Sequence, residues 1–338
     1  EYVGGDLNAY TNKEETVVYS AFLVEHFSRA VELLSDIVFH STFPQAEIDK
    51  EVEVIIDEIQ SYEDSPAELI FDEFEEIVFP NHPLGRKILG KPELLHGFKS
   101  KDALNFTARF YQPHNMVFFV LGDLDFKRVI RLVEKYVSDI PTSNQEYHRQ
   151  SPLIYTPQTL QLHRDTHQAH VMIGRRGYDA HSEKRTALYL LNNILGGPGM
   201  NSRLNVALRE RSGLVYNVEA NLTSYTDTGI FCIYFGTDPK HIERCLRLVH
   251  KELKRLREQP LSSSQFRAAQ KQIIGQIGVA CDNFENKALD MAKTFLHYDK
   301  FEGPEGVFQR IEKLTPHDLW KVANEMFDEN DLSTLIYS

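Results

Sequence analysis

Residues 98–120 read FKSKDALNFTARFYQPHNMVFFV, and residues 314–336 read LTPHDLWKVANEMFDENDLSTLI. The two stretches align without a gap at an offset of 216, so that Asp102 meets Asp318. Each stretch has a helical pattern first and then an apolar run that is typical of a buried strand. The alignment therefore predicts the same helix and strand twice in one chain.

Two further pairs of segments repeat in the same order. Residues 26–38 align with residues 241–253 at an offset of 215, and residues 44–62 align with residues 262–280 at an offset of 218. Three matches at a nearly constant offset indicate two copies of one α/β unit. A length of 338 residues also favours two domains over one.

Composition along the chain predicts where the two copies separate. Residues 141–158 (PTSNQEYHRQSPLIYTPQ) are rich in Pro, Ser, Asn and Gln, which is typical of a linker. We therefore expect a first domain at 1–140 and a second at 159–338. Within them, β-branched and apolar runs predict strands, and apolar residues at helical spacing predict helices. The expected strands include 16–24, 115–121 and 159–174, and the expected helices include 27–38, 44–62, 124–137 and 183–195.

The repeat also makes a prediction about the start of the chain, which opens at Glu1 without Met. The second copy begins near Tyr155 or Thr159. Subtracting about 216 residues places the start of the first copy about 60 residues before Glu1. We therefore expect the opening strand and helix of the first domain to precede this chain.

Charge and cysteine content narrow the function classes. The net charge is -12, from 49 acidic and 37 basic residues, which argues against nucleic acid or an anionic membrane as the main partner. No apolar run is long enough to span a bilayer. The cysteines Cys232, Cys245 and Cys281 are too few and too scattered for a disulfide framework or a cysteine zinc site. A reducing compartment such as the cytoplasm is the mild default, and any targeting segment would precede Glu1.

The expected helix at 44–62 carries two acidic residues beside an apolar stripe. Glu51 and Glu58 are seven residues apart, so they lie about 20° from each other on one edge of that stripe. A carboxylate at the border of a buried face needs a cation or metal partner. The alternative is a solvated acidic helix, because residues 47–76 hold 13 acidic residues and one basic. The second copy has Ala269 and Gln276 at these positions, so the fold itself does not need the carboxylates.

Residues 195–216 (LGGPGMNSRLNVALRERSGLVY) form the second candidate site. A helix is expected to end at the glycines, and a new one to begin near Asn201 or Ser202, which are suitable N-caps. Arg209 and Tyr216 then lie near a helix end and a strand start, where polar groups often face a cleft. The alternative is a surface arginine and a half-buried tyrosine.

The motifs together resemble the pitrilysin/insulinase family of zinc metallopeptidases, which includes the mitochondrial processing peptidase. The resemblance runs in order along nearly the whole chain. It is carried by GGDLNAYTNKEET at 4–16, EVEVIIDEIQSYEDSP at 51–66, HPLGRKILG at 82–90, residues 111–123, and LGGPGMNSRLNVALRERSGLVYNV at 195–218. The resemblance implies an α+β fold of two homologous domains, each a mostly antiparallel sheet packed with helices, forming half of a clam-shell.

The resemblance also implies a zinc site and the roles of particular residues. In this family two histidines of an H-x-x-E-H helix and one distant glutamate hold zinc, and the motif glutamate is the general base. Glu58 matches the distant zinc ligand, and Glu51 matches an acid that supports the ligands from behind. Arg209 and Tyr216 match the pair that contacts the substrate backbone and stabilises the oxyanion. The edge strand that binds substrate main chain to main chain matches Asn8, Ala9, Tyr10 and Thr11.

One departure from the family is decisive for this chain. None of its 14 histidines has Glu at +3 and His at +4, and one carboxylate cannot hold a catalytic zinc ion. We therefore expect a zinc metalloendopeptidase for the complete protein, and neither zinc nor peptide cleavage for this chain alone. Because the Arg–Tyr pair acts on the opposing half in this family, the resemblance implies a homodimer or heterodimer with a composite site and a peptide substrate.

Two other functions remain open from the sequence. Some members of this fold lack the zinc motif and act as non-catalytic partner subunits or scaffolds, although a subunit freed from metal need not retain both Glu51 and Glu58. The third interpretation is an acidic two-domain binding protein of unknown ligand.

Overall fold

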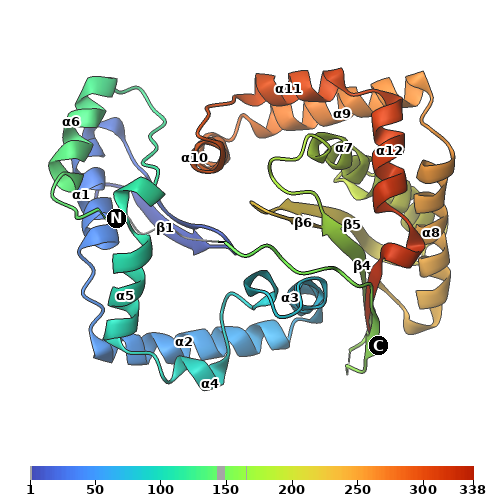
Figure 1. Ribbon diagram of the computed structural model, residues 1–338, viewed down its shortest axis with the longest axis horizontal. Coiled ribbons are helices and arrows are strands. Elements are labelled where there is room, and N and C mark those ends of the chain that lie inside the picture. Colours follow the sequence, from blue (N-terminus) through green and yellow to red (C-terminus); the bar gives the residue numbers. More distant parts are fainter. Residues whose placement is uncertain (1, 143–148, 165) are drawn as a thin grey trace. The chain divides into compact units, whose positions relative to one another are not determined.

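The computed structural model describes residues 2–142, 149–164 and 166–338. Contacts divide the chain into two compact units, each built from three separate segments. Unit 1 comprises Glu1–Ile59, Ile88–Arg149 and Ala280–Glu302, and unit 2 comprises Gln60–Lys87, Gln150–Val279 and Gly303–Ser338. Helices and sheets occur in both units, which confirms the expected mixed α and β class (Figure 1).

Unit 2 is built on a five-stranded sheet of order β3-β7-β4-β6-β5. The β3–β7 pair is parallel, and the other three neighbouring pairs are antiparallel. The strands are β3 (Thr159–Leu162), β4 (Ala169–Gly177), β5 (Val215–Ser224), β6 (Gly229–Thr237) and β7 (Ser333–Tyr337). The helices are α3 (Pro66–Val78), α7 (Arg185–Gly196), α8 (Ile242–Glu258), α9 (Ser263–Ala280), α11 (Pro304–Lys313) and α12 (Pro316–Met326).

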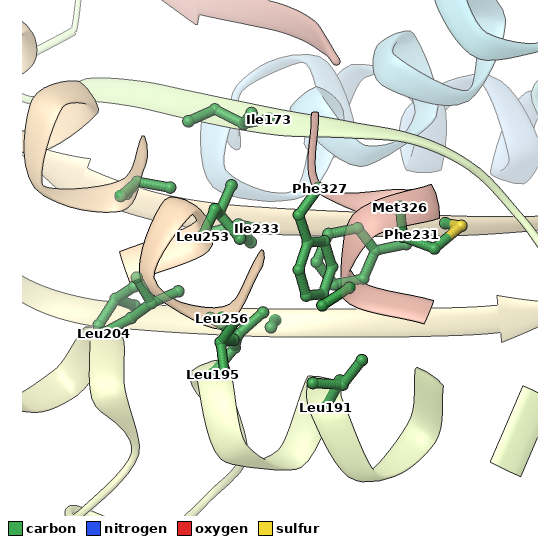
Figure 2. Close-up of a cluster of buried hydrophobic side chains, with 14 of the residues drawn as sticks. Ile173, Leu191, Leu195, Leu204, Phe231, Ile233, Leu253, Leu256, Met326 and Phe327 are labelled. Carbon is green, nitrogen blue, oxygen red and sulfur yellow. The ribbon is translucent and has the colours of Figure 1, made fainter. Parts of the chain in front are cut away.

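The larger core of unit 2 covers one face of this sheet. Strand residues of one parity, such as Ile173, Phe231 and Ile233, pack there against α7, α8 and α12. Figure 2 shows the Phe231 and Phe327 rings side by side, and their centroids are 5.2 Å apart. All of these side chains are completely or almost completely buried.

Strand residues of the other parity form a second core on the opposite face. Met172 and Cys232 belong to it, and helix α3 covers them with Ile70, Phe74 and Val78. Because alternate residues of a strand point to opposite faces, a sheet buried on both sides needs apolar residues at nearly every position. The burial of every residue of β6 fits this requirement.

Unit 1 has a smaller core. Its two-stranded sheet is the hairpin β1 (Asp6–Thr11) and β2 (Thr16–Ala21). One cluster gathers around Phe27, Val31 and Val129, and a second around Val52, Ile59 and Leu95. The helices of this unit are α1 (Phe27–Phe39), α2 (Gln45–Glu63, to Ile59), α4 (Pro92–Leu95), α5 (Ser100–Phe110), α6 (Phe126–Val137) and α10 (Phe284–Tyr298).

The order of the elements repeats, as the aligned segments predict. In each half a hairpin leads through a 3-10 turn into a long helix, α1 or α8, whose starts differ by 215. Helices α2 and α9, and then α3 and α10, start 218 residues apart. Helices α5 and α12 start and end 216 residues apart.

The repeated helices α3 and α10 do not stay with their own halves of the sequence. Helix α3 follows the first copy's α2 but belongs to unit 2, and α10 follows the second copy's α9 but belongs to unit 1. The compact units therefore do not coincide with sequence halves. The assignment of residues 1–140 and 159–338 to two domains stays a prediction, and part of the expected linker 141–158 lies outside the described residues.

Two expected strands differ from the structure. Residues 116–121 form no strand, and Phe118 and Leu121 are exposed, whereas the matching β7 lies between β3 and β4. No described strand pairs with residues 116–121, and extended backbone without a partner strand gains no ladder of hydrogen bonds. The expected strand at 159–174 is two strands, β3 and β4, in different places of the sheet.

Two smaller expectations concern cysteines and membranes. Cys232 and Cys245 are buried in the core as expected, and all three cysteines carry free thiols. No helix in the part of the chain that the structure describes is long and apolar enough to cross a membrane.

A pair of glycine substitutions tests the central packing. A Cβ at Gly174 would clash with the carbonyl oxygen of Phe231 and lie 2.7 Å from the Cα of Cys232. Gly174→Ala should therefore lower the free energy of unfolding by about 1–3 kcal/mol, because the sheet has no room for the methyl group. The control Gly275→Ala lies in α9 with open space around it, and it should raise stability by about 0.5–1 kcal/mol. Urea denaturation followed by circular dichroism measures both, and equal midpoints would contradict the packing.

Candidate functional site

Arg209 lies on an irregular helical segment of unit 2. Residues Asn205–Glu210 form a π-helix, and the backbone N–H of Arg211 donates to the carbonyl of Val206 over 3.0 Å, a five-residue spacing. Single π turns often occur at functional sites because they change which side chains face outwards. Leu208 is buried at this turn, whereas the Arg209 side chain is 47% exposed. Helical backbone begins at Arg203, directly after Ser202, as expected, but the Ser202 hydroxyl has no hydrogen-bond partner and so does not cap the helix.

A glycine turn joins this helical segment to strand β5. Gly213 has a φ of +59°, a left-handed conformation that costs little only for glycine. Its N–H donates to the carbonyl of Arg209 over 2.8 Å, and the N–H of Leu214 donates to the carbonyl of Leu208 over 2.9 Å. These hydrogen bonds fix the chain between Arg209 and the start of the strand.

Tyr216 lies on a β-bulge immediately after that turn. Val215 pairs with Thr237 and Val218 with Phe235, so two residues of β5 lie opposite one of β6. The bulge turns both Tyr216 and Asn217 outwards between the buried Val215 and Val218, and Tyr216 is 85% exposed. Burial therefore does not explain a tyrosine at this position, and its hydroxyl is accessible to a ligand.

The structure brings Arg209 and Tyr216 onto consecutive elements of one unit, as the sequence predicts. The Arg209 Nε is 3.8 Å from the carboxylate of Glu210, an exposed pair that contributes little to stability. A guanidinium and a phenol are both hydrogen-bond donors. Together they can donate to a substrate carbonyl or to an oxyanion.

Glu51 and Glu58 lie on α2 of unit 1, on the helix predicted to carry them. Val52 and Ile59 next to them are buried, but both glutamates are exposed. The expectation that burial forces a partner on these carboxylates is therefore wrong. Their side chains are instead available to a ligand without prior desolvation.

A zinc ion does not fit the residues present. Among the described residues no group of three or more His, Cys, Asp or Glu side chains could hold a metal ion. Catalytic zinc takes about three protein ligands, and the exposed Glu58 supplies one carboxylate. The chain as described therefore has no complete zinc site.

Strand β1, with Asn8, Ala9, Tyr10 and Thr11, offers an open edge in unit 1. It pairs in register with β2, and no other described strand pairs with it. The side-chain oxygen of Asn8 accepts the backbone N–H of Ala9 over 2.8 Å. An edge strand presents unpaired backbone groups, which is the requirement for adding a peptide strand.

The matching edge strand of unit 2 is less accessible. Strand β5 is also the last strand of its sheet, but the side-chain amide of Asn192 donates to the carbonyl of Ala220 over 2.9 Å. A Cβ on Gly196 of α7 would lie 2.6 Å from the backbone nitrogen of Ala220, so the helix approaches this strand closely. Of the two hairpins, the first therefore offers the freer edge.

Three residues with ionisable side chains lie beside β1 and were not predicted from the sequence. Glu15 lies in the turn of the first hairpin, and Lys293 and His297 of α10 contact it. Glu15 lies within the run at 4–16, but no pattern in the sequence pairs it with Lys293 and His297, because α10 is far from β1 in the sequence.

Substitution of Gly213 tests the turn that carries Arg209 and Tyr216. Gly213→Ala should lower the free energy of unfolding by about 1–2 kcal/mol, because the left-handed conformation crowds Cβ against the following carbonyl. Gly213→Asn should lower it less, since Asn tolerates this conformation better. Urea unfolding measures both variants. Equal stability of wild type and Gly213→Ala would contradict the positive φ.

Comparisons with known proteins agree with this architecture. The family described as Insulinase (Peptidase family M16) matches residues 1–92, and the Peptidase M16 inactive domain matches residues 97–273. An uncharacterized zinc protease of Rickettsia bellii is 30% identical over 99% of this chain and 80% of its own length. The uncharacterized zinc protease YmxG of Bacillus subtilis is also 30% identical, over 99% of this chain and 81% of its own length.

Solved structures with the same fold include two bacterial proteins. A peptidase M16 inactive domain from Pseudomonas fluorescens has a TM-score of 0.90 and 19% identity, covering 99% of this chain and 81% of that one. A protease from Helicobacter pylori has a TM-score of 0.88 and 21% identity, covering 100% of this chain and 83% of that one. From the family matches and the relatives, the chain belongs to peptidase family M16, the insulinase family.

Proposed function

We propose that this chain is part of a zinc metalloendopeptidase that cleaves peptides or unfolded protein segments. The exposed Arg209–Tyr216 pair carries the proposal. A π turn, a left-handed glycine and a β-bulge hold two hydrogen-bond donors outwards, an arrangement that the fold itself does not require. The zinc proteases among its relatives support the same conclusion.

Each element has a role in this proposal. Strand β1 binds an extended substrate through the backbone of Asn8–Thr11. Glu58 supplies one zinc ligand, Glu51 supports the ligands, and the other ligands come from an H-x-x-E-H segment outside these 338 residues. Zinc, when bound, supplies an activated water. Arg209 and Tyr216 hold the substrate main chain and donate to the oxyanion.

The proposed active site is composite. The Arg209–Tyr216 pair of one polypeptide acts on a substrate held at the zinc site of another, in a homodimer or heterodimer. This arrangement explains why the pair is exposed in its own unit.

Glu58→Gln tests the metal role in a polypeptide that carries this chain together with H-x-x-E-H. The variant should lose most of its zinc and nearly all peptidase activity, because a neutral amide is a poor zinc ligand. Folding should survive, since the second copy has Gln276 at this position. The matched control Asp57→Asn, an exposed neighbour on α2, should keep both zinc and activity. Metal analysis and peptide hydrolysis measure the outcome, and normal zinc content in Glu58→Gln would exclude Glu58 as a ligand.

Arg209→Ala tests the composite site. In the same longer polypeptide that carries H-x-x-E-H, turnover should fall about a hundredfold, because one donor to the oxyanion is lost. The control Arg211→Ala, an exposed arginine on the same segment, should retain activity. Mixing Arg209→Ala with Glu58→Gln should restore part of the activity when subunits exchange. A mixture as inactive as its components, with exchange shown by differently tagged subunits, would contradict action between subunits.

A second function follows from two observations. The described residues hold no metal cluster, and more than half of the chain matches a domain described as inactive. A non-catalytic partner subunit would show both features. The coding sequence upstream of Glu1 decides between the two functions: H-x-x-E-H there supports the peptidase, and its absence supports the partner subunit.

A further inference from the structure

The turn of the first hairpin contains a carboxylate that is almost completely buried. The Glu15 side chain is only 6% exposed. One of its oxygens accepts the side-chain amide of Asn12 over 2.8 Å, within the turn. The other accepts Nε2 of His297, on helix α10, over 2.7 Å. A buried carboxylate of this kind depends strongly on its cationic partners.

A second cation of α10 contacts the same turn and the strand before it. Lys293 Nζ is 3.5 Å from Glu15 and 5.0 Å from the centroid of the Tyr10 ring. Lys293 and His297 are four residues apart, so they lie on one face of the helix. Helix α10 therefore holds both the turn and one residue of the proposed peptide-binding strand. We name this group of Glu15, Lys293 and His297 the α10 clasp.

The α10 clasp is important for the position of helix α10 because few apolar contacts hold this helix in place. No side chain of α10 is fully buried, whereas the equivalent helix α3 buries four residues, Leu69, Ile70, Phe74 and Val78. Apolar contacts do not depend on protonation, but ion pairs do. A change in charge can therefore loosen the attachment of α10 to β1 and β2, but not the apolar attachment of α3 to its sheet.

Other ionisable groups surround the clasp and must be considered with it. Glu14 forms an ion pair with Arg149, and both influence His297. Asp290 lies near Lys293, and Glu285 lies near Tyr19 of β2. Burial raises the pKa of Asp290 against the lowering effect of Lys293. None of these groups replaces His297 as the partner of the second Glu15 oxygen.

We propose that His297 and Lys293 are positioning residues that hold the Asn8–Thr11 strand ready for peptide binding, and that the charge of His297 controls this state. The inference rests on the proposed function, since it assumes that β1 binds the substrate. With His297 charged and bound to Glu15, the hairpin is fixed and a peptide pairs with a preformed strand edge. With His297 neutral, Glu15 loses its charge-assisted hydrogen bond and the edge is less ordered.

The pH dependence follows from the two partners. The hydrogen bond with Glu15 raises the pKa of His297 above its usual 6.5, against the lowering effect of burial. Burial raises the pKa of Glu15, but hydrogen bonds from His297 and Asn12 and the charge of Lys293 bring it below its usual 4.5. The His297 contribution is complete below 6.5 and is lost as pH rises through the raised value. The Glu15 contribution is complete above 4.5 and is lost as pH falls through the lowered value.

Three variants at position 297 test the proposal on this chain. The first measurement is hydrogen exchange of the β1 and β2 amides, corrected for intrinsic rates. In wild type, protection should fall severalfold as pH rises above 6.5. His297→Lys should stay protected at the higher pH, because lysine keeps its charge, and His297→Gln should be poorly protected throughout. The control His96→Gln, an exposed histidine of unit 1, should behave as wild type.

The second measurement is the affinity for a fluorescently labelled, unstructured peptide, by anisotropy over the same pH range. Affinity should fall severalfold with rising pH in wild type, stay high in His297→Lys and stay low in His297→Gln. The inference would be overturned if hydrogen exchange of the β1 and β2 amides depended on residue 297 but the affinity for the peptide did not. Absence of peptide binding by wild type at every pH would instead refute the role of β1 in the proposed function, with the exchange result unaffected.

Discussion

The five-stranded sheet of unit 2 is apolar on both faces, and the fold of this unit depends on covering both of them. Helices α7, α8 and α12 cover one face and come from the same half of the sequence. The opposite face is covered by α3, which comes from the first half. The segment that follows the acidic helix α2 thus completes the core with strands β4, β6 and β7.

The two copies of the unit have diverged in their edges and in their charges. The first hairpin keeps an open strand and a buried carboxylate in its turn, whereas the second has its edge partly covered by α7 and Asn192. The exposed carboxylates of α2 are replaced by Ala269 and Gln276 in α9. The second copy instead carries the π turn and the bulge. The proposed function therefore assigns the binding of an extended chain and the donation of hydrogen bonds to it to different copies of the same unit.

The sequence predicts the repeated helices well because their apolar residues recur at helical spacing, which depends only on local geometry. It also predicts that Arg209 and Tyr216 lie on consecutive elements. The π turn and the bulge could not be predicted, because they depend on pairing with β6 and on the hydrogen bonds around Gly213. The strand at 115–121 was predicted from its apolar run and from its alignment with the second copy, but a strand also needs a neighbour. The exchange of α3 and α10 leaves no local trace, since each helix is amphipathic wherever it docks.

Because α3 and α10 each dock in the other copy's unit, the two similar helices must be told apart by the hairpins that they contact. Glu75 and Lys293 are both the tenth residue of their helices, and each contacts a hairpin turn. Glu75 accepts the hydroxyl of Tyr225 over 2.8 Å, whereas Lys293 lies beside Glu15. If α3 docked on the first hairpin instead, Glu75 would face the buried carboxylate of Glu15, and two like charges in a desolvated place repel strongly. The opposite charges at this equivalent position therefore disfavour docking of α3 on the first hairpin.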